Sequence, residues 1–377
     1  MKAHSEIKMW TPSTIVFVLL IVLGGFVIAY RLAAGLGAAT NLNDRFPWGL
    51  WIGMDVLGGV AMAAGGFLIA GAVYILNWKK YKPIVRPAIL NAFFGYALAA
   101  TAITFDIGVP YRIWHPVVMW QIGSVMWVVA IHVVLYTTTL ATESSPMVFE
   151  KLKMQGALRV VEKIMVPIVL FGILLSVLHQ SSLGAVYLIT QGKLSPLWYN
   201  SSLPTLFLVS AIMMGLAMVS LESIISGKAF GHAPNRDILT GLARGCLITT
   251  VIYLLLKTFY LATGPGIGAA FAGTMEANMY LLEMAVGVLA PMALLLTKST
   301  LENDNKILMV NILVVAGVLI NRMNVSILGV YRDQTATGLS YFPSLMEFIV
   351  TLAFISVAVV GFKVSVKYLR VLPETKT

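Results

Sequence analysis

The feature that most constrains this chain is a series of about ten long apolar stretches. Each reaches the roughly 20 apolar residues that a helix needs to cross a bilayer, where only helices and closed barrels satisfy every backbone hydrogen bond. Apolar residues make up 59% of the chain and charged residues 11%, whereas soluble domains have about 25% charged residues. We therefore predict an all-α integral membrane protein with helices near residues 13–36, 49–76, 87–109, 115–142, 157–180, 204–226, 237–263, 275–298, 305–328 and 341–367.

The basic residues predict the orientation of these helices. The loops on one side hold only Arg45, Arg112, Lys193 and Arg332, and the other side carries Lys2, Lys8, Lys79, Lys80, Lys82, Arg86, Lys151, Lys153, Lys228, Arg236, Lys298, Lys306, Lys363, Lys367, Arg370 and Lys376. By the positive-inside rule both termini are cytoplasmic. The net charge of +10 then reflects topology and not a nucleic-acid partner. The first apolar stretch is long enough to span and lacks a small-residue cleavage site, so we expect a retained helix.

Cofactor motifs are sparse in this sequence. The single cysteine, Cys246, lies in an apolar stretch, so the chain has neither an iron-sulfur motif nor a zinc ribbon. The glycine-rich run 264–268 follows a predicted helix and not a strand, which argues against nucleotide binding. Electron transfer would therefore require a bound organic cofactor or the metal of a partner.

A weak internal echo suggests how the helices are organised. Residues 182–187 read Ser-Leu-Gly-Ala-Val-Tyr and residues 326–331 read Ser-Ile-Leu-Gly-Val-Tyr, and four predicted helices separate them. This spacing suits two tandem four-helix bundles related by an axis along the membrane normal. We predict one membrane domain over residues 1–377, with bundles at 49–180 and 204–328 and flanking helices at 13–36 and 341–367.

Polar residues gather at the predicted outer ends of the helices. Ionisable groups within membrane segments are costly and mark functional sites by default. Quinone chemistry needs hydrogen-bonding groups at the quinone oxygens and a group that exchanges protons near neutral pH. The alternative is that Asp106 and Arg112 form an interfacial ion pair and that His115 only caps a helix. The candidate headgroup residues are Asp55, Tyr111, Arg112, His115, His179 and Gln180, with Asp55, Asp106 and His179 as the catalytic candidates.

A second set of titratable residues lies deeper or closer to the cytoplasmic side. Such a set could relay protons through the membrane. Snorkelling of long side chains and pairing between helices are the alternative explanations, including a buried Arg244–Glu283 pair. The candidates for the proton path are His132, Glu143, Arg244 and Glu283.

The histidine pattern argues against a b-type haem, which needs axial ligands at one depth. His132 lies about 17 residues into its predicted helix, roughly 25 Å below the outer end, whereas His179 is outward. His115 and His179 could be level, but Pro116 and polar neighbours make His115 a poor ligand. We therefore expect neither haem nor another metal site in this chain.

Several of these segments resemble the NrfD/PsrC family of polysulfide-reductase-type, quinone-interacting membrane subunits. The flanking helices make the chain similar to its longer branch, found in hydrogenase-2-type and high-molecular-weight cytochrome complexes. The segments that carry the resemblance are Pro47–Gly53, Asp106–Gly108, Arg112–Pro116, His179–Gly184, Pro196–Tyr199 and Leu203-Pro204.

The resemblance implies two four-helix bundles in a bacterial inner membrane and a menaquinone or ubiquinone pocket near the periplasmic face, without haem. It also implies a periplasmic ferredoxin-like partner with four iron-sulfur clusters, and further hydrogenase, molybdoenzyme or multihaem cytochrome c subunits. We expect aromatic residues of the outer loops to contact this partner, namely Phe46, Trp48, Tyr187, Trp198 and Tyr341.

Two classes of function follow from these observations. The first is a quinone-reactive subunit of a respiratory redox complex, with possible proton translocation, that is not a complete enzyme alone. The second is a secondary transporter or proton channel without redox chemistry. Transporters usually have helices broken near the membrane midplane, whereas the polar residues here gather at one face, which favours the redox subunit.

Overall fold

The computed structural model of the chain describes residues 7–190, 192–231, 235–331 and 340–372. Lys2, Arg332 and Lys376, which entered the orientation argument, lie outside these residues. Ten helical segments of the described chain are long and apolar enough to cross a membrane, so the predicted all-α membrane class is confirmed. They are Pro12–Ala34 (α1), Trp51–Ile75, Lys79–Asp106 (ending in α5, Val85–Asp106), Val125–Leu152 (α7), Gln155–Leu188 (α8), Leu203–Phe230 (α9), Arg236–Thr263 (α10), Met275–Leu295, Asp304–Tyr331 (beginning with α14, Asp304–Met323) and Leu345–Tyr368 (α16).

Four of these spans are assembled from more than one helical piece, and the second and the eighth are examples. The second span joins the π-helical turns η1 (Trp51–Gly58) and η2 (Gly71–Ile75) through α3 (Gly59–Met62) and α4 (Ala64–Ala70). The eighth joins α11 (Met275–Met284), η6 (Ala285–Leu289) and α12 (Ala290–Leu295). Wide π turns of this kind occur frequently at functional sites.

Several long helices begin at a side chain that caps the first turn. The side chain of each capping residue accepts a backbone N–H that the helix itself leaves unpaired, a recurrent way to fix a helix start. Ser344 and Glu347 form a reciprocal capping box at the start of α16. The capping residues are Thr11 for α1, Ser124 for α7, Asn235 for α10, Asn303 for α14 and Ser344 for α16.

The fourth membrane helix begins and ends about ten residues later than the predicted range of 115–142. The membrane-spanning helix α7 starts at Val125 because Ser124 caps it, and the apolar residues before it form only the short helix α6 (His115–Val118) and a loop. The fifth helix was predicted too short, because α8 continues through His179–Ser182 to Leu188. His115 is therefore outside the span, and His179 lies well inside one.

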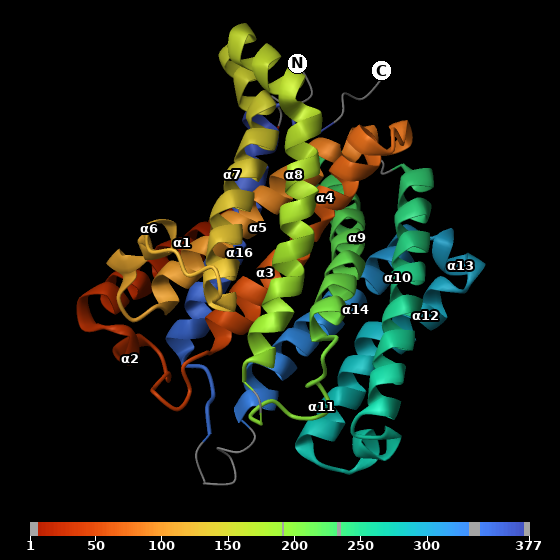
Figure 1. Cartoon of the computed structure of the whole chain (residues 1–377). Helices are drawn as coiled ribbons and strands as arrows, with labels where there is room; N and C mark the ends of the chain where they lie inside the picture. Colours follow the sequence, from red (N-terminus) through yellow and green to blue (C-terminus); the bar gives the residue numbers. More distant parts are fainter. Residues whose placement is uncertain (1–6, 191, 232–234, 332–339, 373–377) are drawn as a thin grey trace.

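Two groups of helices and one flanking pair pack together (Figure 1). The pieces of the second span contact α5 and α8, and α7 lies against both of these helices, while α9, α10, α12 and α14 form the second group. Helices α1 and α16 pack against each other and against α5 and η1. The division into two tandem four-helix bundles stays a prediction.

The backbones of the two groups touch where α4 meets α9. A Cβ atom on Gly215 would lie 2.5 Å from the backbone nitrogen of Gly65, and one on Gly65 would lie 2.8 Å from the carbonyl oxygen of Gly215. Small residues allow membrane helices to approach this closely. Figure 1 marks both termini at one end of the molecule, which we call the terminal end, and the opposite end is the far end.

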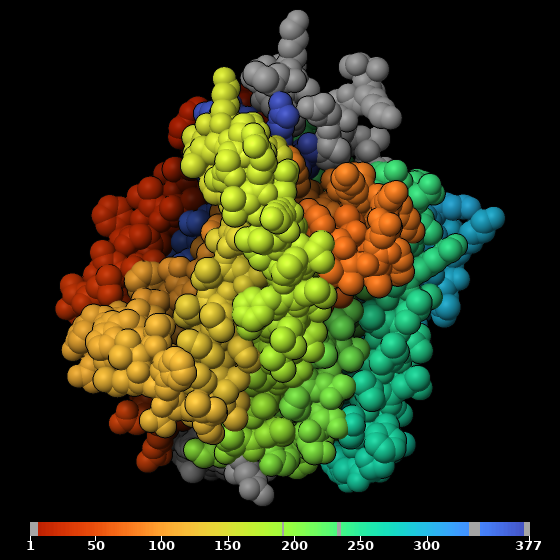
Figure 2. All heavy atoms as spheres, turned by 45° about the horizontal axis from the view of Figure 1, so that its top comes forward, coloured from red at the N-terminus to blue at the C-terminus, as the bar shows by residue number. Residues whose placement is uncertain are grey.

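The segment between α5 and α7 stands out on the side of the molecule (Figure 2, golden orange). It carries the short helices η4 (Pro110–Arg112) and α6 and exposes large apolar side chains. Trp120 is 67% exposed and Ile122 is 73% exposed. Trp and Tyr side chains favour membrane interfaces, and this segment has that composition.

Candidate functional site

Asp55 lies at the head of a large cavity. The carboxylate belongs to the π-helical turn η1, and its Oδ2 accepts a hydrogen bond of 2.8 Å from the Thr351 hydroxyl of α16. The cavity has a volume of about 1070 Å³ and is enclosed by α1, the second span, α5, α9 and α16. Binding pockets for small molecules are typically about 300–1,000 Å³ with a few polar groups in an apolar wall.

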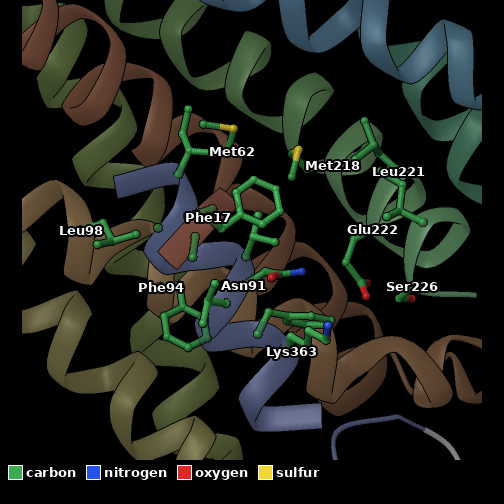
Figure 3. A pocket seen from close by; sticks show the side chains of 18 of the residues that line it. Phe17, Met62, Asn91, Phe94, Leu98, Met218, Leu221, Glu222, Ser226 and Lys363 are labelled. Atoms are coloured by element: carbon green, nitrogen blue, oxygen red, sulfur yellow. The ribbon is translucent and has the colours of Figure 1, made fainter. Parts of the chain in front are cut away.

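The cavity runs from Asp55 toward the terminal end. Along the second span its wall extends from Met54 to Gly66, which corresponds to roughly 18 Å at 1.5 Å per residue. The wall between is mostly apolar and includes Met62, Leu98 and Phe354. Figure 3 shows polar side chains gathered on one side of it, those of Asn91, Glu222, Ser226 and Lys363.

The polar side chains of the cavity wall near the terminal end differ in their hydrogen bonds. Lys363 donates to the hydroxyls of Thr14 at 2.7 Å and Thr11 at 3.3 Å. Glu222 is 9% exposed, and its Oε1 has no hydrogen-bond partner within the described chain. The cavity therefore has an apolar middle, a carboxyl group at one end and several polar side chains at the other.

Asp106 is the last residue of α5, and its side chain is buried. Its Oδ1 has no hydrogen-bond partner among the residues described. The neighbouring carbonyls of Phe105 and Ile107 accept hydrogen bonds of 2.8 and 2.5 Å from the buried guanidinium of Arg31 on α1. A cation at a helix C-terminus is favourable because the last carbonyls carry partial negative charge.

The two histidines predicted to lie at different depths are neighbours. His132 is only seven residues from the start of α7, roughly 10 Å into the helix, so the predicted 25 Å is wrong. Its ring centroid lies 6.2 Å from that of His179 on α8. His179 is fully buried and packs 5.5 Å from the ring of Tyr96, which in turn packs 4.5 Å from Tyr136.

This histidine and tyrosine cluster continues toward the terminal end as a column of buried polar groups. His132, Tyr136, Thr139 and Glu143 follow one face of α7 at helical spacing. Glu143 lies against Gly172 of α8, where a Cβ atom would be 2.8 Å from its Oε1. Within the described chain no partner is found for Tyr96 Oη, Tyr136 Oη, Glu143 Oε2, Ser176 Oγ, His132 Nδ1 or either nitrogen of His179.

Buried polar groups are nearly always hydrogen-bonded, to protein or to ordered water. Ordered water commonly bridges buried polar groups that lack a protein partner. We define the column as His132, His179, Tyr96, Tyr136, Ser176 and Glu143, a run of buried and partly buried polar groups between α5, α7 and α8.

The new position of His132 removes the depth argument against a haem shared with His179. A haem would need a flat slot between the two rings for its porphyrin. Tyr96 closes on His179, and neither histidine lines the large cavity of the described chain. The residues thus do not fit a haem, and its absence stays a prediction.

The proposed outer headgroup residues are not brought together. Tyr111 is 73% exposed, Arg112 is exposed with it, and His115 is partly exposed beside Trp114 at 4.3 Å. They do not line the cavity headed by Asp55, because the segment before α7 loops out instead of continuing the helix. An Asp106–Arg112 salt bridge is not found among the described residues.

Gln180 and Glu283 have structural partners. Gln180 is fully buried and donates to the carbonyl of Val60 at 2.9 Å, which ties α8 to the second span. Glu283 forms a 2.8 Å salt bridge with Lys257 of α10, not with Arg244, which is exposed. Glu283 also accepts from Trp198 at 2.9 Å, Asn321 at 2.9 Å and Asn324 at 3.1 Å.

The aromatic residues expected to form a docking surface are largely internal. Phe46 is 2% exposed, Tyr187 is 1% exposed and Trp198 is 1% exposed. Phe46 and Tyr331 stack edge to face at 4.7 Å, and Trp48 packs against Tyr187. These residues therefore stabilise the far end of the fold and present little surface to a partner.

Three residues of these sites were not predicted from the sequence. Arg31 is a charge within the first apolar stretch, which alone marks it as a candidate. Tyr136 shares the α7 face with His132 and Glu143, and this spacing was readable from the sequence. Thr351 has no such signal, because only tertiary packing brings it to Asp55.

The fold and the site define a class of protein. This is a multi-pass helical membrane protein in which a partly buried carboxyl group heads a long apolar cavity and a separate column of polar groups runs beside it. Among the described residues no cluster of three or more His, Cys, Asp or Glu could hold a metal ion.

The comparison with known proteins identifies the family. The sequence profile described as "Polysulphide reductase, NrfD" matches residues 38–332, well over half of the chain. The chain therefore belongs to the NrfD polysulphide reductase family, as its motifs predicted.

Three relatives are similar over nearly their whole length. The probable Ni/Fe-hydrogenase 2 b-type cytochrome subunit of Escherichia coli K12 is 31% identical over 98% of this chain and 94% of its own. The menaquinone reductase integral membrane subunit of Nitratidesulfovibrio vulgaris Hildenborough is 27% identical, over 98% and 93%. A putative dimethyl sulfoxide reductase membrane subunit from Halobacterium salinarum is 24% identical, over 94% and 90%.

Proposed function

We propose that this chain is the quinone-interacting membrane subunit of a respiratory redox complex, and that the cavity headed by Asp55 is its quinone site. The observation that carries the proposal is the cavity itself, which is long, mostly apolar and closed at one end by a carboxylate. An isoprenoid quinone has matching chemistry, with a polar headgroup and a long apolar chain.

The relatives support this proposal. One carries menaquinone reductase in its name, and others are membrane subunits of hydrogenase and dimethyl sulfoxide reductase. By their names, these proteins are all subunits of redox enzymes. A menaquinone or related quinone is accordingly the substrate proposed here.

The residues of the cavity would act on the quinone in distinct ways. A quinone and its quinol differ by two electrons and two protons, so the site must exchange protons at the quinone oxygens. Asp55 is placed to donate to or accept from one such oxygen, while Thr351 fixes the other side of its carboxylate. Met62, Leu98 and Phe354 would hold the apolar chain and exclude water.

Proton movement is assigned to the column between α5, α7 and α8. Its groups run from Glu143 toward His132, and eleven residues of α7 between these two correspond to roughly 16 Å. A carboxylate, tyrosine hydroxyls and imidazoles linked by water could pass protons along this distance. With both termini in the cytoplasm, the column would lead from the cytoplasmic side of a bacterial inner membrane to its periplasmic half.

Electrons are proposed to come from or go to a partner at the far end. The sequence has one cysteine and therefore cannot hold an iron-sulfur cluster of its own. A ferredoxin-like iron-sulfur subunit would fill this role, together with hydrogenase, molybdoenzyme or multihaem cytochrome c subunits. The aromatics expected to contact the partner are buried, so the exposed apolar segment before α7 replaces them as the candidate contact surface.

The site is tested by filling the cavity. The Leu98→Trp variant places a large ring in the cavity wall, so we expect the purified protein to lose most of the quinone that solvent extraction recovers from the wild type. Leu174→Trp is the matched control, because Leu174 is an exposed residue of α8 that faces away from the cavity. Equal quinone recovery from the Leu98→Trp protein and the control would contradict the assignment.

A further inference from the structure

Asp55 of the cavity and the end of α5 that carries Asp106 are both held by residues outside the region that matches the family profile. The family profile covers residues 38–332, whereas α1 spans Pro12–Ala34 and α16 spans Leu345–Tyr368. Despite this, α1 and α16 supply much of the cavity wall, including Phe17, Phe354 and Ile355. The flanking pair is therefore more than a membrane anchor.

Helix α16 is fastened to the start of the second span. The buried carboxylate of Glu347 accepts from the backbone N–H of Ser344 at 2.8 Å and from the hydroxyl of Tyr341. That hydroxyl also accepts from the backbone N–H of Leu50 at 3.0 Å, and the Glu347 carbonyl accepts from Trp51 Nε1 at 3.1 Å. Burial, and then the bond to Glu347, raises the pKa of Tyr341, so its hydroxyl stays a donor.

This fastening fixes where Thr351 meets Asp55. Thr351 follows Glu347 by four residues, hence one turn along the same face of α16. Asp55 follows Trp51 by four residues along η1. The bond between Trp51 and Glu347 sets the register between η1 and α16. The hydrogen bond between Thr351 and Asp55 then forms one turn further along both helices.

Helix α1 performs a similar task for α5. Arg31 is 2% exposed and donates to two carbonyls that flank Asp106. Two bonds from one planar guanidinium fix both distance and direction, which a lysine at this position could not reproduce. The end of α5 is therefore held against α1 and cannot move independently of the flanking pair.

We propose that Thr351 and Arg31 are positioning residues for the quinone reaction, with Thr351 orienting Asp55 and Arg31 fixing the end of α5 that carries Asp106. This inference rests on the proposed quinone site. It assigns a reaction role to a helix pair outside the matched family region, so a chain without α1 and α16 would need other residues to hold these two carboxylates.

The inference predicts a separation between binding and turnover. Removing the Thr351 hydroxyl leaves the cavity wall almost unchanged in volume, so quinone should be retained and KM should not change. Asp55 would lose the donor that fixes its carboxyl group, and kcat should fall roughly tenfold, the effect of losing one hydrogen bond of about 1.4 kcal/mol. A merely structural role would instead reduce assembly, quinone content and turnover together.

The experiment uses the assembled complex with its natural electron partner and measures quinone content, KM and kcat. The test variants are Thr351→Val and the conservative Thr351→Ser, and the matched control is Thr249→Val, whose hydroxyl bonds only to carbonyls of its own helix α10. We expect lower kcat at unchanged KM for Thr351→Val, wild-type behaviour for the control, and recovery with Thr351→Ser.

Arg31→Lys and Asp55→Asn complete the experiment. Arg31→Lys keeps the charge but not the paired geometry, so it should lower kcat while quinone content persists. Wild-type kcat in Thr351→Val and Arg31→Lys, with turnover lost in Asp55→Asn, would overturn the positioning roles alone. Wild-type turnover in Asp55→Asn would overturn the quinone site on which they rest.

Discussion

Three acids within the membrane-spanning helices of this protein differ in how many donors surround them. Glu283 accepts from four side chains at 2.8–3.1 Å, including its salt-bridge partner Lys257. Asp55 has one side-chain donor, Thr351, and Glu143 Oε2 has none within the described chain. A carboxyl group with donors on both oxygens is fixed in place, whereas one with a free oxygen can still bond to a substrate or to water. Glu283 is thus structural, and Asp55 and Glu143 are the candidates for proton exchange.

At the residue scale, the column makes a specific prediction for Glu143. The Glu143→Gln variant keeps the size of the side chain but cannot release a proton. We expect vesicles that contain the assembled complex to show proton uptake slowed by roughly a hundredfold, the usual effect of losing a proton-transfer group. A pH-sensitive dye inside the vesicles measures this rate during quinone turnover.

The control for this prediction is Glu162→Gln. Glu162 lies on α8 near the same end of the membrane but is exposed, so its loss should leave proton uptake unchanged. Normal proton uptake in the Glu143→Gln vesicles would exclude the column as the path, whatever the control shows.

At the element scale, the contact between α4 and α9 joins the two groups of helices through glycine. The Gly215→Ala variant would place a methyl group 2.5 Å from the Gly65 nitrogen, so the helices must move apart. We expect a loss of about 1–3 kcal/mol of stability, the usual effect of overpacking, seen as a lower midpoint of thermal unfolding in detergent. Gly25→Ala, which has open space around its Cβ position, should unfold like the wild type; equal midpoints for both variants would contradict the tight contact.

Helix number and class could be predicted from the sequence because the apolar stretches are long and separated by charged turns. The start of α7 could not be predicted from hydropathy, since the residues before it are equally apolar, although Gly123 and the capping Ser124 marked it. That one error placed His132 about 15 Å too deep and hid its contact with His179. The sequence singled out Asp55 as a functional candidate, but its partner Thr351 comes from α16 by tertiary packing alone.

At the scale of the whole molecule, the cavity and the column lie on different sides of α5. The cavity is enclosed by the flanking pair α1 and α16 together with α9, and the column lies where α5 meets α7 and α8. Substrate and protons would therefore use separate routes, and the middle of α5 borders both, with Leu98 in the cavity wall and Tyr96 in the column. Under the proposed function, an electron partner would dock at the far end, where Asp55 and Asp106 lie.

The measurement that tests the account most directly is photoaffinity labelling with an azido-naphthoquinone, followed by peptide mapping of the labelled complex. The account predicts label on the cavity wall, on the peptides around Met54, Met62, Leu98 and Phe354, and loss of this label in the presence of excess unlabelled quinone. Competed label confined to the exposed segment from Tyr111 to Trp120, or to α7 and α8 around His132 and His179, would contradict the claim that the cavity headed by Asp55 is the quinone site.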